Sequence, residues 1–218
     1  MNQLKAGVIL SYITIALQIV IALSYTPYML RMLGQSEFGL YSLAASIVAY
    51  LTVLDLGFGN AAIRYTANFK AKNMMREMEE MFGMFFIIYV IIGLFTLVAG
   101  VVLAANVENL FDRAMTPNEV ERTRIMLWLL VANLAFTFPM SVWGSIISAY
   151  ERFFFLKGVS VIRSVANPLG MVVLLAVGYK AVAMVVVITT FNVATLLLNW
   201  WYCKHRLHLR LRFARFQW

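Results

Sequence analysis

Apolar residues in this chain occur in long runs, and most charged residues lie in the short segments between them. Several runs reach or exceed the roughly 20 residues that a helix needs to cross the hydrocarbon layer of a membrane. The run over residues 87–92 does not alternate between polar and apolar positions, which argues against the strands of a membrane barrel. The pattern therefore predicts six helical spans, at about residues 7–33, 38–69, 81–105, 124–150, 158–177 and 181–202.

The composition is that of a chain whose solvent is lipid. Hydrophobic residues make up 62% of the sequence and charged residues only 13%, and the mean hydropathy is +0.81, whereas a soluble domain is close to half apolar. The first apolar run is too long for a cleavable signal peptide and lacks its processing pattern. We expect an all-α, polytopic transmembrane bundle, with one six-helix lobe over residues 1–203 and a basic tail over 204–218.

Basic residues predict the orientation of the bundle. If the N-terminus is cytoplasmic, the inside segments carry eleven of them: Lys5, Lys70, Lys72, Arg76, Arg152, Lys157, Lys204, Arg206, Arg210, Arg212 and Arg215. The outside segments carry five: Arg31, Arg113, Arg122, Arg124 and Lys180. The positive-inside rule then places both termini in the cytoplasm, as an even number of spans requires. Orientation thus accounts for the net charge of +8 without a nucleic-acid partner.

For the basic tail, residues 204–218, a stop-transfer flank is favoured over a lipid-contacting or nucleic-acid-binding segment.

Four predicted spans carry polar residues on one helical face, because their spacing follows offsets of three, four and seven. Lipid offers such residues no partner, so they face the bundle interior or a water-filled cavity. Helix packing explains any single stripe equally well, but four stripes that include amides favour a shared polar cavity. The stripes are Ser11, Thr14, Gln18 and Tyr25; Asn133, Thr137, Ser141, Ser145 and Ser148; Ser160, Ser164 and Asn167; and Thr189, Asn192, Thr195 and Asn199. From them we take Gln18, Asn133, Thr137, Ser141, Asn167 and Asn192 as candidate substrate-binding residues. The third span has a weakly polar face and is expected to pack at the periphery.

Three charged residues lie well inside the predicted spans: Asp55, Arg64 and Arg163. At about 1.5 Å per residue, both arginines lie roughly 8 to 9 Å below the cytoplasmic surface. Guanidinium groups match phosphate oxygens in geometry and charge, so we expect the two arginines to bind an anionic head group. Snorkelling to the interface is the alternative for each. Asp55 lies deeper and is either an arginine partner, which we favour slightly, or a cation or proton site.

Glycine and proline mark positions where the helices are expected to bend. Gly57 and Gly59 lie between Asp55 and Arg64, and Pro139 and Pro168 lie inside the fourth and fifth spans. These four residues are candidate hinges, as kinked helices often accompany alternating access.

The sequence lacks the components of an enzyme centre. The only histidines, His205 and His208, lie in or next to the basic tail, and Cys203 is the single cysteine. No span contains paired carboxylates. We therefore expect neither catalysis nor a metal or other cofactor, and one chain cannot form a disulfide.

Two segments carry a resemblance to a known family. Residues 33–41, LGQSEFGLY, and residues 54–65, LDLGFGNAAIRY, resemble the polysaccharide flippases of the multidrug/oligosaccharidyl-lipid/polysaccharide exporter superfamily. The resemblance implies two six-helix lobes around a central cavity, which move sugars linked to undecaprenyl pyrophosphate from the inner to the outer leaflet of a bacterial or archaeal inner membrane. The family pattern carries over onto Asp55, Gly57, Gly59 and Arg64. Asn60 lies in the same motif and is counted among the candidate substrate-binding residues.

The chain departs from that family in length, since members usually carry twelve to fourteen helices. It resembles an amino-terminal lobe, and we expect either a truncated product, which we favour, or a lobe that pairs with a second lobe or another copy of itself. The expected partners are membrane lipid and a lipid-linked oligosaccharide. The competing functions are an antiporter of cationic drugs and a non-transporting membrane scaffold.

Overall fold

A computed structural model describes residues 3–55, 57–108 and 115–207, with side chains from residue 8 onward. These residues form one short 3-10 helix and six α-helices: α1 (Gln3–Thr52), η1 (Val53–Asp55), α2 (Phe58–Ala71), α3 (Met75–Ala105), α5 (Pro117–Ala149), α6 (Phe153–Ala176) and α7 (Ala181–Arg206). The described part of the chain has no strand, so the predicted all-α class is confirmed. By length and composition it holds five helical stretches able to cross a membrane, which makes this a multi-pass membrane protein.

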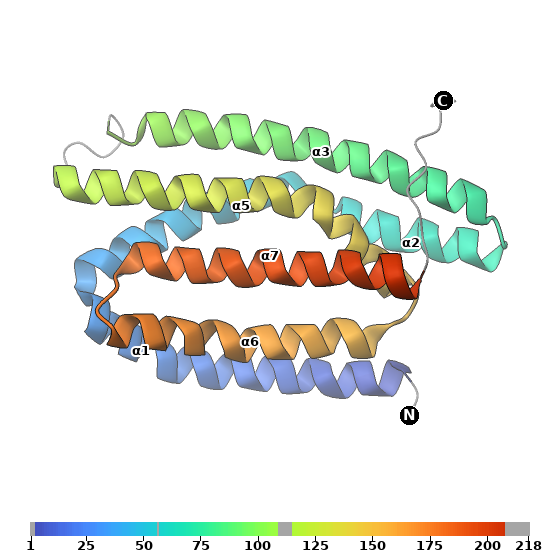
Figure 1. The fold of residues 1–218 in the computed structure, drawn as a ribbon, viewed down its shortest axis with the longest axis horizontal. Helices are drawn as coiled ribbons and strands as arrows, with labels where there is room; N and C mark the ends of the chain where they lie inside the picture. The colour runs from blue at the N-terminus through green and yellow to red at the C-terminus, as the bar shows by residue number, and fades with distance from the viewer. Residues whose placement is uncertain (1–2, 56, 109–114, 208–218) are drawn as a thin grey trace.

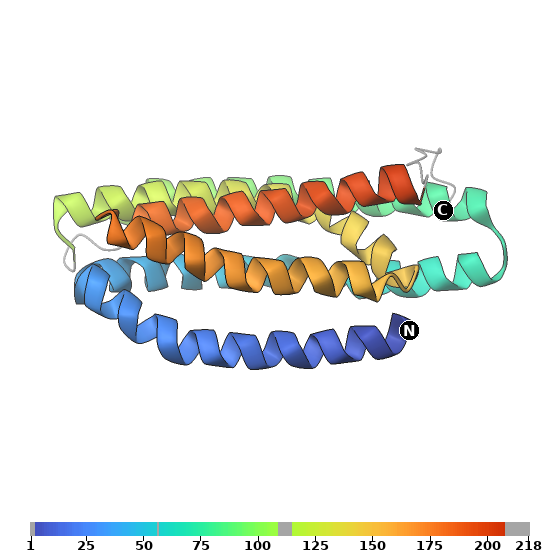
Figure 2. The same cartoon turned by 60° about the horizontal axis from the view of Figure 1, so that its bottom comes forward.

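The long helix α1 reverses direction at Gly34. This residue has φ 78° and ψ 169°, a backbone conformation that is essentially restricted to glycine. Figures 1 and 2 show the two arms that result, the first running along the bundle and the second running back behind the other helices. The reversal lies in the gap between the first two predicted spans, which end at residue 33 and begin at residue 38, and helix continues almost up to it on both sides.

The predicted second span, residues 38–69, is not one helix. Its first part is the second arm of α1 followed by η1, and its second part is α2, which begins after Gly57. Gly57 has φ 77° and ψ 13°, a left-handed conformation that interrupts the regular helical backbone. The interruption lies where the glycine pair predicted a bend. Because Val8–Ala71 is a single span by length and composition, the count of six crossings stays a prediction.

The other helices begin or end beyond their apolar runs. The helix α5 begins at Pro117 instead of residue 124, because Thr116 and Glu119 form a capping box that satisfies its first backbone N–H groups. In the same way α3 and α6 begin before residues 81 and 158, and α7 continues to Arg206. Apolar runs therefore underestimate the full length of these helices.

Neighbouring helices pack side by side in the order α3, α5, α7, α6 and the first arm of α1, while α2 lies against α3 and α5 (Figure 1). One face of α3 is buried against α5 and α2 around Phe82 and Tyr89. The opposite face exposes Leu94 and Phe95, as expected of a helix that contacts lipid. The edge position of α3 in Figure 1 agrees with the peripheral packing expected of the third span.

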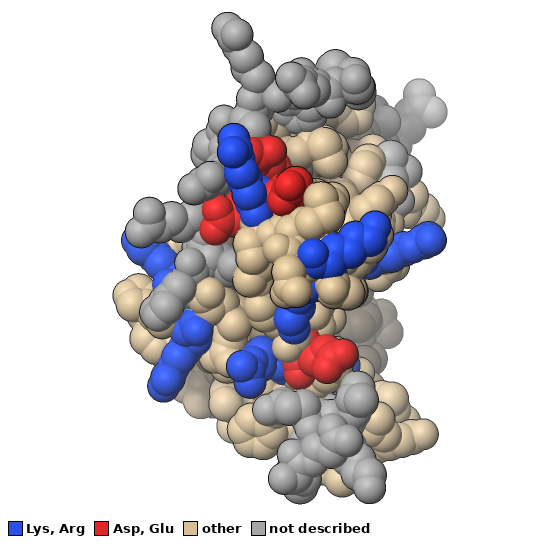
Figure 3. Space-filling model, turned by 90° about the vertical axis from the view of Figure 1, so that its right-hand side faces the viewer, with Lys and Arg blue, Asp and Glu red and all other residues tan. Residues whose placement is uncertain are grey.

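Several basic side chains lie at one end of the bundle, together with some acidic ones (Figure 3). The start of α1, the end of α7, the α2–α3 turn and the α5–α6 turn all lie at this end (Figures 1 and 2). At the opposite end Arg122 and Arg124 are paired with Glu37 and Glu108. This asymmetry fits the predicted orientation, whose cytoplasmic assignment stays a prediction. Of the residues used to predict it and the tail, Arg113, His208, Arg210, Arg212 and Arg215 lie outside the described residues.

Candidate functional site

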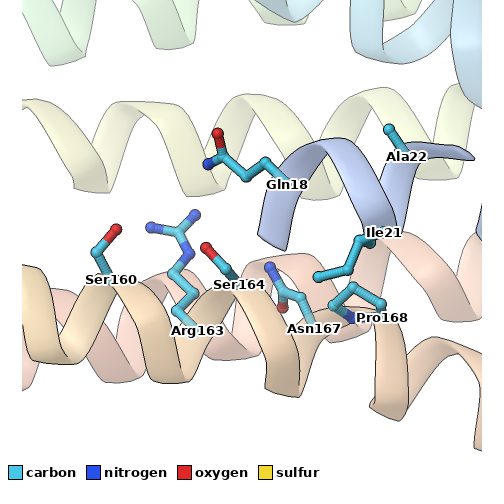
Figure 4. Close-up of a pocket in the computed structure, with 8 residues that line it drawn as sticks. All are labelled: Gln18, Ile21, Ala22, Ser160, Arg163, Ser164, Asn167 and Pro168. Atoms are coloured by element: carbon cyan, nitrogen blue, oxygen red, sulfur yellow. The ribbon is translucent and has the colours of Figure 1, made fainter. Parts of the chain in front are cut away.

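A pocket of about 440 Å³ lies between the first arm of α1 and α6 (Figure 4). Its lining comprises Gln18, Ile21 and Ala22 from α1, and Ser160, Arg163, Ser164, Asn167 and Pro168 from α6. The pocket therefore brings together four residues singled out from the sequence: Gln18, Arg163, Asn167 and Pro168.

Helical spacing explains why the polar residues of α6 share this pocket. Ser160, Arg163, Ser164 and Asn167 follow offsets of three, four and seven, which places them on one face of the helix. In Figure 4 the Arg163 guanidinium extends toward α1, where the Gln18 amide lies nearby, and the two serines lie on either side of it. Two helices thus contribute one cation, two amides and two hydroxyls to a single hollow.

The pocket has unused hydrogen-bonding capacity. Within the described residues Arg163 is half-buried and forms no ion pair. The Asn167 Oδ1 atom is buried and has no hydrogen-bond partner there. Buried polar atoms are nearly always hydrogen-bonded, and a guanidinium offers five N–H donors in a planar fork. The arrangement suits an anionic ligand that also carries hydroxyl groups.

The polar stripes of α5 and α7 bond to each other instead of lining this pocket. Asn192 Nδ2 donates to Asn133 Oδ1 at 2.9 Å and to Thr137 Oγ1 at 2.8 Å. Asn192 is buried, and these bonds join the two helices. Of the four stripes, two line the pocket between α1 and α6, whereas Asn192 of α7 bonds to the stripe of α5, as polar side chains between apolar helices do. A substrate-binding role for these three residues stays a prediction.

Asp55 lies at the end of η1, next to α3. Ser141, another candidate residue, lies half-buried on α5. Ser141 itself donates to the Phe138 carbonyl at 2.6 Å. Among the described residues no ion pair joins Asp55 to an arginine, so the favoured arginine-partner role is not formed in this structure. The reason is the break at Gly57, which separates Asp55 from the helix that carries Arg64.

Arg64 and Asn60 lie on α2, exposed and outside the pocket. The helix α2 packs on α3 and α5, whereas α6 packs on α1 and α7. The expected pairing of Arg64 with Arg163 around one head group is therefore not present in this structure, because the two helices lie in different parts of the bundle. Individual roles for Arg64 and Asn60 stay predictions.

The candidate hinges lie at irregular points of the helices. Gly57 is left-handed at the start of α2, and Gly59 packs against the Tyr89 and Ser145 hydroxyls. Pro139 lies inside α5, which bends in its second half (Figure 1), and Pro168 lies inside α6. Whether these points move stays a prediction.

Sequence reasoning left out three residues that the structure makes prominent. Ser160 and Ser164 belonged to a stripe but were not chosen as binding residues, although their spacing from Arg163 placed them on its face. Tyr89 belongs to the third span, whose face was judged only weakly polar, and the structure buries it fully with no hydrogen-bond partner for its hydroxyl among the described residues.

The sequence profile of the family described as "polysaccharide biosynthesis protein" matches residues 4–217, almost the whole chain. The chain belongs to this family. The resemblance to flippase-type proteins is confirmed, and a polysaccharide biosynthesis protein of this kind is of transporter type and is not part of a known enzyme family. Searches of curated proteins and of solved structures give no match. The family assignment indicates a role in polysaccharide synthesis or export.

The pocket and the α5–α7 contact predict opposite responses to thiol labelling. In broken-cell membranes, where both faces are accessible, a Ser164→Cys variant should react with a water-soluble maleimide at least about tenfold faster than a Thr137→Cys variant. The natural Cys203 is buried and its Sγ contacts the Trp143 carbonyl at 3.5 Å, so it should contribute little background. Equal labelling of both positions would contradict the distinction between pocket and packing contact.

Proposed function

We propose that this polysaccharide biosynthesis protein is one lobe of a transporter that moves a lipid-linked oligosaccharide, carried on undecaprenyl pyrophosphate, from the inner to the outer leaflet of a bacterial or archaeal cell membrane. The observation that carries the proposal is Arg163, which lies in the pocket between α1 and α6 and forms no ion pair with any described residue. Its planar fork suits the pyrophosphate oxygens. The amides of Gln18 and Asn167, with Ser160 and Ser164, supply hydrogen bonds of the kind that sugar hydroxyls need.

The position of the pocket along the bundle supports this assignment. Arg163 lies roughly three helical turns from the start of α6, and that start lies at the basic end of the bundle (Figures 1 and 3). By the positive-inside rule we place this end at the cytoplasm. The pocket is then reached from the side where a lipid-linked precursor carries its pyrophosphate in the inner leaflet.

A second lobe completes the proposed transporter. Gln18 is exposed on the first arm of α1, and lipid offers an amide no hydrogen-bond partner. A second six-helix lobe, either a carboxy-terminal half or another copy of this chain, would cover this polar surface. Bending at Gly57, Pro139 and Pro168 would then exchange inward-open and outward-open states, whose populations the bound lipid shifts.

The chemistry of the pocket favours an anion over a cation. The residues that line it include one guanidinium and no carboxylate, whereas an antiporter of cationic drugs requires negative charge at its binding site. The scaffold alternative accounts for the Asn192 hydrogen bonds but gives no use for an unpaired arginine in a hollow.

The proposal predicts that Arg163→Ala weakens binding of a polyprenyl pyrophosphate. With purified protein and farnesyl pyrophosphate as probe, we expect at least a tenfold loss of affinity, or about 1.4 kcal/mol. Arg163→Lys should bind with intermediate affinity, because it keeps the charge and loses the bidentate fork. In cells with normal protein levels, Arg163→Ala should also reduce surface polysaccharide.

Two further variants make this test specific. Arg31→Ala removes an exposed arginine close to the Gly34 turn and should leave binding unchanged. Arg64→Ala, alone and combined with Arg163→Ala, measures whether a second guanidinium contributes. Farnesol should bind no more weakly to the Arg163→Ala variant than to the unmodified protein. Unchanged pyrophosphate affinity and polysaccharide export in Arg163→Ala would refute the phosphate site.

A further inference from the structure

We propose that Lys157 is a second cation for the pyrophosphate of the substrate, at the edge of the pocket nearest the basic end of the bundle. This inference rests on the proposed function, because it assigns one phosphate to Arg163 and the other to Lys157. Arg64 does not take this place, since its helix α2 packs on α3 and α5. The site formed by Lys157, Ser11 and Ser160 is called here the Lys157 subsite.

A pyrophosphate that joins a lipid to a sugar requires more than one cation. Each of its phosphates carries a negative charge, whereas a guanidinium carries a single positive charge, and an unbalanced charge is costly to remove from water. Besides Arg163, the described side chains of the first arm of α1 and of α6 include two basic residues, Arg31 and Lys157. Arg31 lies near the Gly34 turn. Lys157 lies within two helical turns of Arg163 and is therefore the candidate for the second charge.

Lys157 continues the polar stripe of α6 that lines the pocket. Lys157, Ser160, Ser164 and Asn167 are separated by three, four and three residues, which keeps them on one face of the helix. Ser160 belongs to the lining of the pocket, and Lys157 lies one turn nearer the start of α6. The stripe thus leads from the basic end of the bundle into the pocket.

A contact between Tyr25 and Met171 fixes the register of α1 against α6. Tyr25 Oη donates to Met171 Sδ at 2.8 Å. Figures 1 and 2 show the first arm of α1 and α6 running side by side in the same direction away from the basic end. Because helices rise equally per residue, the same register places Gln18 level with Ser164. Both of these residues line the pocket, which agrees with that register.

The same register brings a residue of α1 to the level of Lys157. Seven residues nearer the start of each helix, Ser11 lies level with Lys157, and Ser11 shares a helical face with Gln18. In Figure 4 the Arg163 guanidinium lies between Ser160 and the next serine of α6. The Cα atoms of Lys157 and Arg163 are about 9 Å apart along the helix axis. Their long side chains can therefore reach neighbouring phosphates of one ligand.

Burial separates Lys157 from the other basic residues at this end of the bundle. Lys157 is half-buried, although it has no ion pair and no aromatic ring contact among the described residues. The other described basic residues of the turns and helix ends there are exposed: Lys70, Lys72, Arg76, Arg152, Lys204 and Arg206. A half-buried ammonium group without a carboxylate partner beside a polar pocket suits an anionic ligand.

The test is binding of two probes that differ by one phosphate, farnesyl pyrophosphate and farnesyl monophosphate, to the purified full chain. Lys157→Met keeps an apolar stem and removes the charge. It should weaken pyrophosphate binding at least tenfold and monophosphate binding less than twofold, because a single phosphate occupies the bidentate fork of Arg163. Arg163→Ala should weaken binding of both probes. Lys157→Arg keeps the charge and should bind pyrophosphate normally.

The matched control is Lys72→Met, which removes the same charge from the exposed α2–α3 turn at the same end of the bundle and should bind both probes normally. Three results would overturn the Lys157 subsite: undiminished pyrophosphate binding in Lys157→Met, an equal loss in Lys72→Met, or equal losses for the two probes. The first would mean that Lys157 only snorkels to the interface, and the others that anions are attracted without a defined site.

The two arginine and lysine variants separate this inference from the proposed function. Weakened binding of both probes in Arg163→Ala, together with normal binding in Lys157→Met, would reject the Lys157 subsite and retain the phosphate site at Arg163. Normal binding in Arg163→Ala would reject the phosphate site of the proposed function itself.

Discussion

Gly100→Ala lowers the melting temperature of the purified protein sharply, and a second substitution, Val131→Ala, restores much of the loss. This is the expected result because a Cβ atom at Gly100 would lie 2.2, 2.5 and 2.9 Å from three side-chain atoms of Val131. Val131 is buried to 1% exposure, and its branched side chain is confined to few rotamers. Overpacking of this kind costs about 1–3 kcal/mol.

The control for this experiment is Gly158→Ala in α6, where a Cβ atom would meet nothing within 4 Å. There we expect unchanged or slightly higher stability, because alanine favours helix over glycine. Gly93→Ala should be destabilising and insensitive to Val131→Ala, since its Cβ would lie 2.7 Å from the backbone oxygen of Ala135. A Gly100→Ala protein as stable as the Gly158→Ala protein would show that α3 and α5 are not packed as closely as described.

Glu37→Ala should destabilise the end of the bundle that contains the Gly34 turn, by about 1–3 kcal/mol. Glu37 is buried, pairs with Arg122 of α5, and accepts a hydrogen bond from the backbone N–H of Ala181, the first residue of α7, at 3.4 Å. Its loss would leave both partners without their acceptor. Arg122 is partly exposed and can turn to water, so the cost should stay below that of a fully buried ion pair.

A double-mutant cycle of Glu37→Ala and Arg122→Gln measures the coupling free energy between the two residues. This coupling should be well above the few tenths of a kcal/mol found for independent sites. Thermal unfolding in detergent is the measurement. Glu121→Ala, which removes an exposed neighbouring carboxylate, should change stability little. Additive effects of the Glu37 and Arg122 substitutions would mean that the pair does not hold α1, α5 and α7 together.

The sequence predicted the helices well where apolar runs determine them. The start of α7 at Ala181 agrees with prediction, and the turn after residue 33 lies at Gly34. The break at Gly57 was predicted only as a bend, because the apolar run is continuous across it. Whether a glycine inside a span takes a left-handed conformation depends on what the following helix packs against, and hydropathy carries no information about that.

Prediction of the binding residues from the sequence has a similar limit. Helical spacing identified one face of α6, and the structure places Arg163 and Asn167 together with Gln18 in a pocket. Spacing along one helix does not say which neighbour that face meets, so the Asn192 bonds to Asn133 and Thr137 were missed. The inference that Arg64 and Arg163 cooperate used depth alone. Depth is only one coordinate of a side chain, and the two arginines lie on helices that pack in different parts of the bundle.

The backbone at Gly34 decides the direction of every helix that follows it. A straight α1 of 50 residues would be about 75 Å long, more than twice the thickness of the roughly 30 Å hydrocarbon layer. The chain avoids such a rod through one torsion angle that a residue with a β-carbon rarely adopts. The absence of a single methyl group thus determines whether the second arm of α1 returns toward the side from which the first arm began, and with it the up-or-down sense of all later segments.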